Sequence, residues 1–472
     1  MFDEANRFPN FGEVITELKI NGIRCHSSTV IPITSPIVAF CGLNGTGKST
    51  ILQLAAAAYR PPASAAYSIS DFMVVSALDP QPFKDTASVE FRFWQESRST
   101  RPLTLSRSRT STRWRGYSRR RQRSVYLAGI GMYLPRCEQP SFASRARFLT
   151  VSGTSDVVGR IRDCTCKILG TGYDRLISSI LNIRDRRGGR ISSVQRGGMQ
   201  YSEAHMGFGE ARTIHIVSTL ESLPPQSLVL LEEPETSLHL SAQHEFGRYL
   251  VDVAIERKHQ IFVTTHSEFL LQSLPSASRI YLERIATGIR AIPGLTAIEA
   301  KSLMALGHVR ALTVLVEDPC AKEVLVEIIR RHDPVFLRSL SICVGGDKDK
   351  IRNTVHGLRE TNLRIAAVRD ADKEGAPAEN IFKLPGTLPP EKEIFQNGAF
   401  RDHVRNTYGV ELADFATELV GIDHHDWFDR LADRIQKSHE ALVSEAAKAY
   451  VASLPETETS TLVQLLKEAT RS

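Results

Sequence analysis

The stretch Gly42-Leu43-Asn44-Gly45-Thr46-Gly47-Lys48-Ser49-Thr50 has the residues and spacing of a complete phosphate-binding loop. An apolar run at 36–41 predicts a buried strand before it, and residues 51–59 predict a helix after it. Glycines let backbone N–H groups turn toward phosphate oxygens, and a helix N-terminus adds partial positive charge. Lys48 can then reach the β- and γ-phosphates, while the Ser49 hydroxyl can ligate Mg²⁺. We therefore expect residues 44–50 to bind a nucleoside triphosphate.

Length and composition limit the class of protein. A chain of 472 residues is too long for one core, so two or three domains are expected. No apolar run approaches the roughly 20 residues that span a bilayer, and the N-terminus has no secretory pattern. The seven cysteines are scattered and form no zinc-type pairs. We expect a cytoplasmic protein with reduced thiols and no membrane contact.

Positive charge is concentrated in one segment. Ten arginines and no acidic residue occur between Arg98 and Arg123, although the net charge of the chain is only +6. Such a block repels itself unless it meets a polyanion, and Trp114 and Tyr117 offer stacking faces for bases. This pattern favours contact with nucleic acid. A solvated arm is the alternative.

The remaining pattern predicts an α/β protein. Strands at 227–231 and 260–265 alternate with helices at 211–223 and 241–256, which suits a parallel sheet covered on both faces. The Arg-rich segment lies in a mixed insertion at about 60–200. Within that insertion we expect a helix at 173–183 and a mobile loop at 184–198.

A second, smaller α/β unit follows a connecting helix at 296–310. Its predicted strands are 312–316, 340–344 and 364–368, and the chain from about 400 looks helical. The expected domains are therefore 1–295, 308–400 and a helical segment 401–472.

Two acids end the apolar strand Leu228-Val229-Leu230-Leu231-Glu232-Glu233. In a P-loop enzyme the first acid, Glu232, would face Mg²⁺, and the second, Glu233, would polarise the attacking water as general base. One strand later, the run 261–267 places His266 at a strand end, where it can hydrogen-bond the γ-phosphate. These residues complete the predicted ATPase site.

Three segments, GLNGTGKST, LVLLEEPETSLH and VTTHS, resemble the ABC-type ATPases of the RecF/SMC-like group, and within it the OLD (overcoming lysogenization defect) family. The resemblance covers roughly residues 12–285. It implies that a Gly-rich signature of one protomer closes on ATP held by the other, and so a homodimer or larger assembly. Met206-Gly207-Phe208-Gly209-Glu210 is the candidate signature, with Gly207 and Gly209 contacting the nucleotide, although it lacks the usual serine.

A second group of acids follows strands of the C-terminal unit. Glu317 comes after the strand 312–316, and Asp370 and Asp372 come after the strand 364–368. Acids at these positions can turn toward one Mg²⁺ or Mn²⁺ ion, which can clamp a scissile phosphodiester. Acids at strand ends are also common without a metal.

The order of these acids, with Gly345-Gly346-Asp347 between them, resembles the Toprim domain that follows the ATPase in OLD nucleases. The resemblance spans roughly residues 308–400 and implies that Glu317, Asp370 and Asp372 are metal ligands. Asp318 stands where Toprim domains usually have Gly, and Ala321 stands where many OLD enzymes have a second acid. Lys392 is a candidate for the catalytic lysine.

Three functions follow from these resemblances. The first is an ATP-regulated, metal-dependent DNA endonuclease that defends against phage or plasmid DNA. The second is an ATPase sensor or scaffold with an inert Toprim-like domain that controls a separate nuclease. The segments Val316-Glu317-Asp318 and Pro389-Pro390-Glu391 resemble the Septu-type ATPases, which have this function. The third is a RecF-like DNA repair ATPase.

Overall fold

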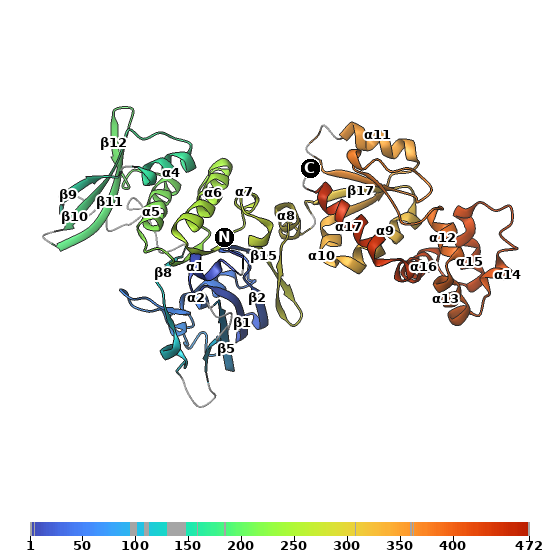
Figure 1. The fold of residues 1–472 in the computed structure, drawn as a ribbon, viewed down its shortest axis with the longest axis horizontal. Coiled ribbons are helices and arrows are strands. Elements are labelled where there is room, and N and C mark those ends of the chain that lie inside the picture. Colours follow the sequence, from blue (N-terminus) through green and yellow to red (C-terminus); the bar gives the residue numbers. More distant parts are fainter. Residues whose placement is uncertain are drawn as a thin grey trace. The chain divides into compact units, whose positions relative to one another are not determined.

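A computed structural model describes residues 2–3, 5–94, 102–107, 113–129, 148–157, 159–183, 186–306, 308–358, 361 and 363–470. The chain divides into two compact units, Met1–Ala300 and Lys301–Ser472 (Figure 1). Among the described helices, none combines the length and hydropathy that a bilayer crossing requires.

The first unit is built on a six-stranded sheet with strand order β16-β15-β3-β14-β13-β8. All neighbours in it are parallel except β16, which pairs antiparallel with β15 at one edge. The strands are β3 (Ile37–Gly42), β8 (Val125–Ala128), β13 (Leu228–Glu232), β14 (Gln260–Thr264), β15 (Arg279–Ile285) and β16 (Gly288–Pro293). Every residue of β3 is buried, as in a strand covered on both faces. The predicted parallel sheet is confirmed.

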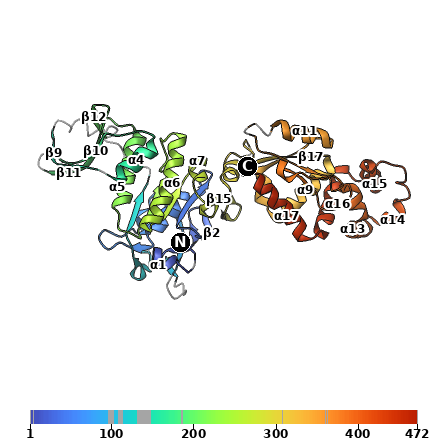
Figure 2. The same cartoon turned by 45° about the horizontal axis from the view of Figure 1, so that its top comes forward.

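Helices cover the two faces of this sheet. On one face, α2 (Lys48–Ala56) shares a core with Leu228, Leu230 and an antiparallel sheet of order β2-β1-β5-β6. The strands of that sheet are β1 (Ile15–Ile23), β2 (His26–Pro32), β5 (Phe83–Phe93) and β6 (Leu103–Ser106). Side chains alternate along β13, so Val229 and Leu231 face the other side. There α6 (Leu240–Arg257) lies against β3 and β14 (Figures 1 and 2).

Two predictions within the insertion were wrong. The expected helix at 173–183 is strand β10 (Arg175–Ile183), and the expected mobile loop contains strand β11 (Arg186–Arg196). They pair antiparallel with each other in a sheet of order β12-β11-β10-β9, where β9 is Leu149–Asp156 and β12 is Met199–Ser202. Apolar residues at 176, 177, 180 and 181 fit helical spacing equally well, and the cross-strand partners decide in favour of a strand.

The described arginines of the basic block are partly structural. Arg120 donates a hydrogen bond to the Tyr67 carbonyl at 2.8 Å. Arg123 is 8% exposed and donates to the Phe11 carbonyl at 3.0 Å. The expected stacking face of Trp114 is wrong, because its ring is 6% exposed in the core. Arg113, Arg115 and Arg119 are exposed, whereas Arg98, Arg101 and Arg109 lie outside the described residues.

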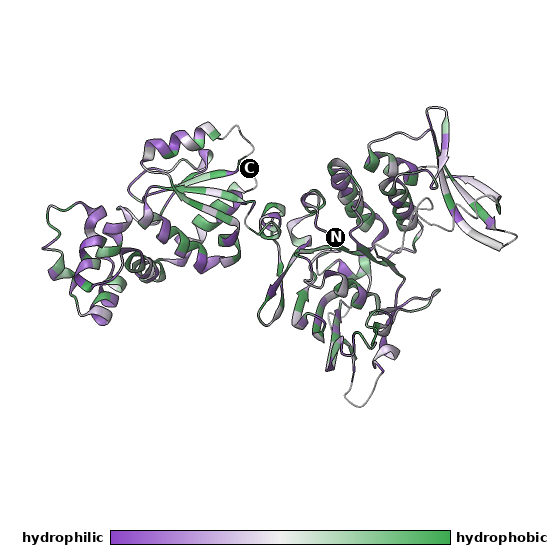
Figure 3. Cartoon of the chain, turned by 180° about the vertical axis from the view of Figure 1, so that it is seen from behind, coloured by the Kyte–Doolittle hydropathy of each residue, from purple (hydrophilic) through white to green (hydrophobic). Residues whose placement is uncertain are grey.

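The second unit contains a parallel sheet of order β18-β17-β19-β20. Its strands are β17 (Leu312–Val316), β18 (Leu340–Val344), β19 (Ile365–Arg369) and β20 (Ile381–Lys383). They are largely hydrophobic (Figure 3). The chain leaves β17 toward β18 on one side and returns to β19 on the other. The carboxyl ends of β17 and β19 therefore flank a topological switch point, where open α/β sheets bind ligands.

One core joins this sheet to the helices that follow it. It includes residues of α9 (Pro319–His332), α16 (His439–Ser453) and α17 (Glu456–Ala469). On the other face, Ile351 and Val355 of α11 (Lys348–Leu358) pack against Leu315 and Ala367. Residues 401–472, which the sequence analysis treats as a separate segment, thus complete the fold of the second unit.

The buried position of Arg123 generates a stability prediction. We expect Arg123→Ala to lower the free energy of unfolding by about 1–3 kcal/mol, because it removes a charge-assisted hydrogen bond and a packed aliphatic stem. The exposed Arg119→Ala variant should stay within about 0.5 kcal/mol of the parent. Urea unfolding followed by fluorescence measures both, and equal effects of the two substitutions would contradict the structural role of Arg123.

Candidate functional site

The phosphate-binding loop connects β3 to α2, as its sequence predicts. Gly47 caps α2 in the left-handed conformation, with φ of 81°. A Cβ atom at Gly47 would lie 2.2 Å from His26 Nε2 and 2.7 Å from Cys25 Sγ, so only glycine fits. Nε2 of His26 lies 3.2 Å from the Gly47 carbonyl oxygen and supports the loop from below. Sequence reasoning did not identify His26.

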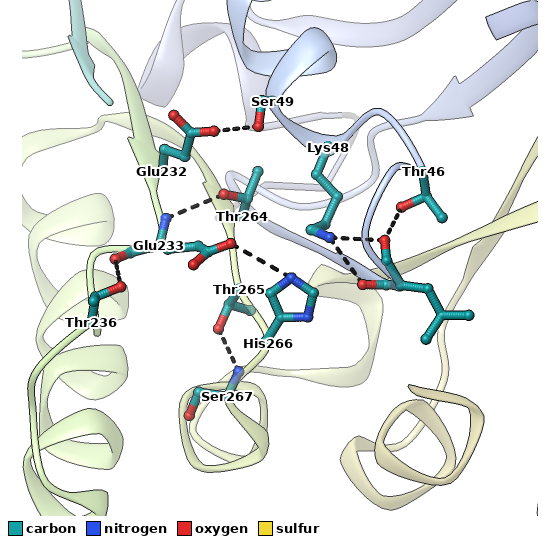
Figure 4. Close-up of polar contacts among 12 residues, drawn as sticks. Thr46, Lys48, Ser49, Glu232, Glu233, Thr236, Thr264, Thr265, His266 and Ser267 are labelled. Carbon is teal, nitrogen blue, oxygen red and sulfur yellow. Dashed lines mark hydrogen bonds and ion pairs between the residues drawn. The ribbon is translucent and has the colours of Figure 1, made fainter. Parts of the chain in front are cut away.

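Lys48 directs its amine to the inside of this loop (Figure 4). Its Nζ donates hydrogen bonds to the carbonyl oxygens of Gly42 at 2.9 Å and Leu43 at 3.1 Å. Burial lowers the pKa of Lys48, while the carboxylates of Glu233 and Glu232 act in the opposite direction. The amine of Lys48 therefore lies beside the loop, where neutral carbonyl groups accept its hydrogen bonds.

The other residues of the loop differ in their surroundings. Asn44 and Gly45 are exposed, and the Gly45 carbonyl accepts a hydrogen bond from Arg284 of β15. The Thr46 hydroxyl donates to the Leu43 carbonyl at 2.8 Å. Thr50 is buried, and its hydroxyl accepts a hydrogen bond from Arg24 at 3.2 Å. Thr50 and Thr46 thus fix the loop, while Asn44 and Gly45 form its accessible edge.

Ser49 and Glu232 meet directly, since the Ser49 hydroxyl donates a hydrogen bond to Glu232 Oε1 (Figure 4). Two oxygen atoms of the kind that Mg²⁺ prefers thus converge at one point beside Lys48. Behind them, the buried Arg212 donates to the Glu232 carbonyl at 2.9 Å. Arg212 belongs to α5 (Phe208–Ser222) and ties that helix to the end of β13. No motif around Arg212 in the sequence indicates this role.

Glu233 and His266 face each other across the ends of β13 and β14. Glu233 Oε1 lies 3.5 Å from His266 Nε2. Glu233 has φ of 41°, and its backbone N–H donates to the Thr264 carbonyl at 3.1 Å, which fixes this unusual backbone. Burial lowers the pKa of His266, and the charge of Lys48 lowers it further, against the opposing effect of Glu233. The imidazole is therefore neutral at pH 7.

A second carboxylate supports this arrangement from behind. Glu235 is 6% exposed and accepts a hydrogen bond from the Thr265 hydroxyl. Burial raises the pKa of Glu235. The Thr265 hydroxyl in turn accepts from the Ser267 backbone N–H at 2.9 Å, so the pair fixes the chain on both sides of His266. The acidic spacing in Glu233-Pro234-Glu235 was the available sequence signal for this residue.

Gly207 and Gly209 stand at the start of α5. A Cβ atom at Gly209 would lie 2.4 Å from the Ser237 carbonyl oxygen, so glycine permits α5 to approach the loop after β13. Arg212, three residues after Gly209 in α5, contacts the Glu232 carbonyl at the end of β13.

The predicted acids of the second unit line one cavity of about 790 Å³. Glu317 Oε1 accepts a hydrogen bond from the Asp370 backbone N–H at 3.3 Å, which joins the ends of β17 and β19. Asp372 forms an ion pair with Lys373 at 2.6 Å. Asp370 is 4% exposed, and burial together with Asp318, Glu317, Glu391 and Asp372 raises its pKa to about 8.

Asp318 caps a helix. Its Oδ1 accepts a hydrogen bond from the Ala321 backbone N–H at 2.7 Å and caps α9, with Pro319 at the first helical position. Ala321 is fully buried. Lys392 also lines the cavity, as do three residues that sequence reasoning missed: Glu391, His424 and His425.

Comparisons with known proteins agree with the first site. Residues 17–122 match the family model of an AAA domain, and residues 159–271 match that of an AAA ATPase domain. No protein of curated function is significantly similar to the chain.

Solved structures of SMC heads are similar to it. The SMC head domain of Thermotoga maritima has a TM-score of 0.36 at 14% identity, over 59% of this chain and 98% of that one. The Pyrococcus furiosus Smc head bound to the C-terminal domain of ScpA has a TM-score of 0.40 at 12% identity. The match covers 62% of this chain and 99% of that one. An SmcHead bound to the C-winged helix domain of ScpA has a TM-score of 0.40 at 15% identity. The match covers 59% of this chain and 96% of that one. The two family matches and the geometry of the phosphate loop show that the first unit contains a P-loop ATPase domain.

Proposed function

We propose that this protein is an ATP-hydrolysing defence enzyme of the OLD type, in which the ATPase controls a metal-dependent DNA endonuclease in the second unit. The observation that carries the proposal is the meeting of Glu317, Asp370 and Asp372 in one cavity beside a topological switch point. Such a cavity can accept a phosphodiester, and Asp372 in it is also paired with Lys373.

Hydrolysis of ATP follows from the first site. Lys48 would exchange its two carbonyl partners for β- and γ-phosphate oxygens. Ser49 and Glu232 would hold Mg²⁺, which neutralises phosphate charge when bound. Glu233 would orient and deprotonate the attacking water, and neutral His266 would contact the γ-phosphate and hold the Glu233 carboxylate in place. The hydrogen-bonded backbone of Glu233 fixes the direction of this base.

Two protomers would be needed for a complete ATP site. Gly207 and Gly209 open the N-terminus of α5, where backbone N–H groups can bind phosphate. The resemblance to ABC-type ATPases implies that they would act on ATP held by a second copy. Closure of such a homodimer on ATP would give the ATPase a means to regulate the second unit.

DNA cleavage would use the acids of the second unit. Asp370 has a buried Oδ1 atom without a hydrogen-bond partner among the described residues, and its pKa is raised by the neighbouring carboxylates. A divalent cation would relieve this repulsion, so the donor set fits Mg²⁺ or Mn²⁺. Glu317, Asp370 and Asp372 would hold the cation against a scissile phosphate. The exposed Arg113, Arg115 and Arg119 would attract the DNA backbone.

Two features of the second unit favour the alternative function of an ATPase scaffold. Asp318 is committed to capping α9, and the buried Ala321 replaces the second acid of many OLD enzymes. With fewer ligands than those enzymes, the second unit would be inert, and the protein would be an ATPase scaffold for a separate nuclease, as in Septu-type systems.

The first prediction concerns nucleotide binding. Lys48→Ala should weaken ATP binding about 100-fold or more, because charge-assisted contacts to phosphate contribute about 1.5–3 kcal/mol each. Lys19→Ala, on an exposed position of β1, is the matched control and should bind normally. Isothermal titration measures both, and undiminished affinity of the Lys48 variant would contradict the assignment of the loop.

The second prediction separates binding from hydrolysis. Glu233→Gln should retain ATP but lower its turnover by roughly 10²-fold or more, since general base catalysis contributes about that much. Glu256→Gln, on exposed α6 surface, should turn over ATP at the parent rate. Steady-state phosphate release checks both variants, and a normal rate for Glu233→Gln would assign the base to another residue.

The third prediction distinguishes the two proposed functions. Purified protein should nick supercoiled plasmid with Mg²⁺ or Mn²⁺ in an ATP-dependent manner, and Asp370→Asn should abolish nicking without loss of ATP hydrolysis. Asp402→Asn, an exposed residue of α13 (Gly398–Tyr408), is the control. Intact ATP hydrolysis without nicking under every condition would overturn the nuclease and support the scaffold.

A further inference from the structure

The cavity of the second unit is lined by a second group of polar residues, which includes histidines as well as a carboxylate. Glu391 lies in α12 (Pro390–Gln396), and His424 and His425 lie in the 3-10 helix η8 (His424–Asp426). Each offers one ligand atom, and these atoms all lie within 4.8 Å of one another. Glu391 Oε1 is 3.6 Å from His425 Nδ1. Two ligand atoms that each lie about 2.1 Å from one ion are separated by about the same distance as Glu391 Oε1 and His425 Nδ1.

Glu391 is a buried carboxylate that the protein pairs only in part. It is only 3% exposed, and its Oε2 has no hydrogen-bond partner among the described residues. Burial and the charge of Asp318 raise its pKa to about 7. A buried carboxylate oxygen left unpaired is costly and uncommon in native proteins. The nearby Asp318 Oδ2 and Asp370 Oδ1 atoms are also buried, and neither has a hydrogen-bond partner in the part of the chain that the structure describes.

The histidines are held in position from outside the cavity. Asp423 Oδ1 accepts a hydrogen bond from the His425 backbone N–H at 3.1 Å and lies 3.3 Å from His424 Nδ1. A carboxylate behind one imidazole nitrogen is the usual partner of a metal-binding histidine, because it fixes the ring and leaves the other nitrogen for the ion. Asp423 thus contacts the His424 ring through Nδ1 and the His425 backbone through its N–H group.

We propose that Glu391, His424 and His425 bind a divalent transition-metal ion at a site separate from the predicted site of Glu317, Asp370 and Asp372. Two imidazoles and one carboxylate suit Zn²⁺, Fe²⁺ or Ni²⁺, whereas Mg²⁺ prefers oxygen ligands alone. Three protein ligands leave a coordination position open toward the cavity, as in catalytic zinc sites. Participation of this ion in DNA cleavage would rest on the proposed nuclease function, but binding of the ion does not.

Titration of the full-length, tag-free protein with Zn²⁺ after removal of metals by a chelator tests the proposal. The parent should bind with an affinity at least 10-fold above that of His425→Gln and His424→Gln, since loss of metal-site partners typically costs 10- to 100-fold. His403→Gln is the matched control, because His403 faces Glu445 at 3.5 Å and does not line the cavity. Co²⁺ in place of Zn²⁺ should give a visible absorption band that both cavity histidine variants lose.

His425 is half-exposed, so its substitution leaves the core intact, and circular dichroism confirms folding. Equal Zn²⁺ affinity in the parent, His424→Gln and His425→Gln would overturn the proposed site, whatever the nicking assay shows. Tight binding lost in these two variants, but kept in Asp370→Asn, would establish it even if no plasmid is nicked. Displacement of Zn²⁺ by an equal concentration of Mg²⁺ would also contradict it.

Discussion

The ATPase domain depends on one buried ammonium group. The Nζ atom of Lys48 donates hydrogen bonds to two carbonyl oxygens of its own loop, Gly42 and Leu43. Carbonyl dipoles keep the amine in place, while burial makes its charge costly and thus favours exchange of these partners for phosphate oxygens. Three features position groups around this one charge. They are the close approach of Gly47 to His26, the parallel strands that carry the acids, and the hydrogen bonds of the Glu233 backbone.

Both units place polar side chains where parallel strands end. In the first unit, Glu232 ends β13 and Glu233 follows it, while His266 comes after β14, next to the loop after β3. In the second unit, Glu317 follows β17 and Asp370 follows β19. Carboxyl ends of adjacent parallel strands meet at one edge of a sheet, so residues distant in sequence come together without further design.

The sequence predicted those parts of the structure that depend on contiguous patterns. The phosphate loop, the apolar strands and the acids after them are local signals, and the structure puts them on the expected elements. Strands β10 and β11 were missed because their apolar spacing fits two periods, and pairing with distant strands decided between them. Trp114 was interpreted as a surface ring, since nothing near it in sequence reveals that Phe83 of β5 packs against it. Glu391 and the two cavity histidines come from separate segments without a shared motif.

The most direct measurement of the central claim is a structure of the protein with Mg²⁺ and a non-hydrolysable ATP analogue. We expect the Lys48 amine to leave the carbonyls of Gly42 and Leu43 for the β- and γ-phosphates, and Ser49 to exchange Glu232 for the metal ion. A nucleotide bound elsewhere, with Lys48 still on its two carbonyls, would contradict the role of Lys48 as the phosphate-binding group.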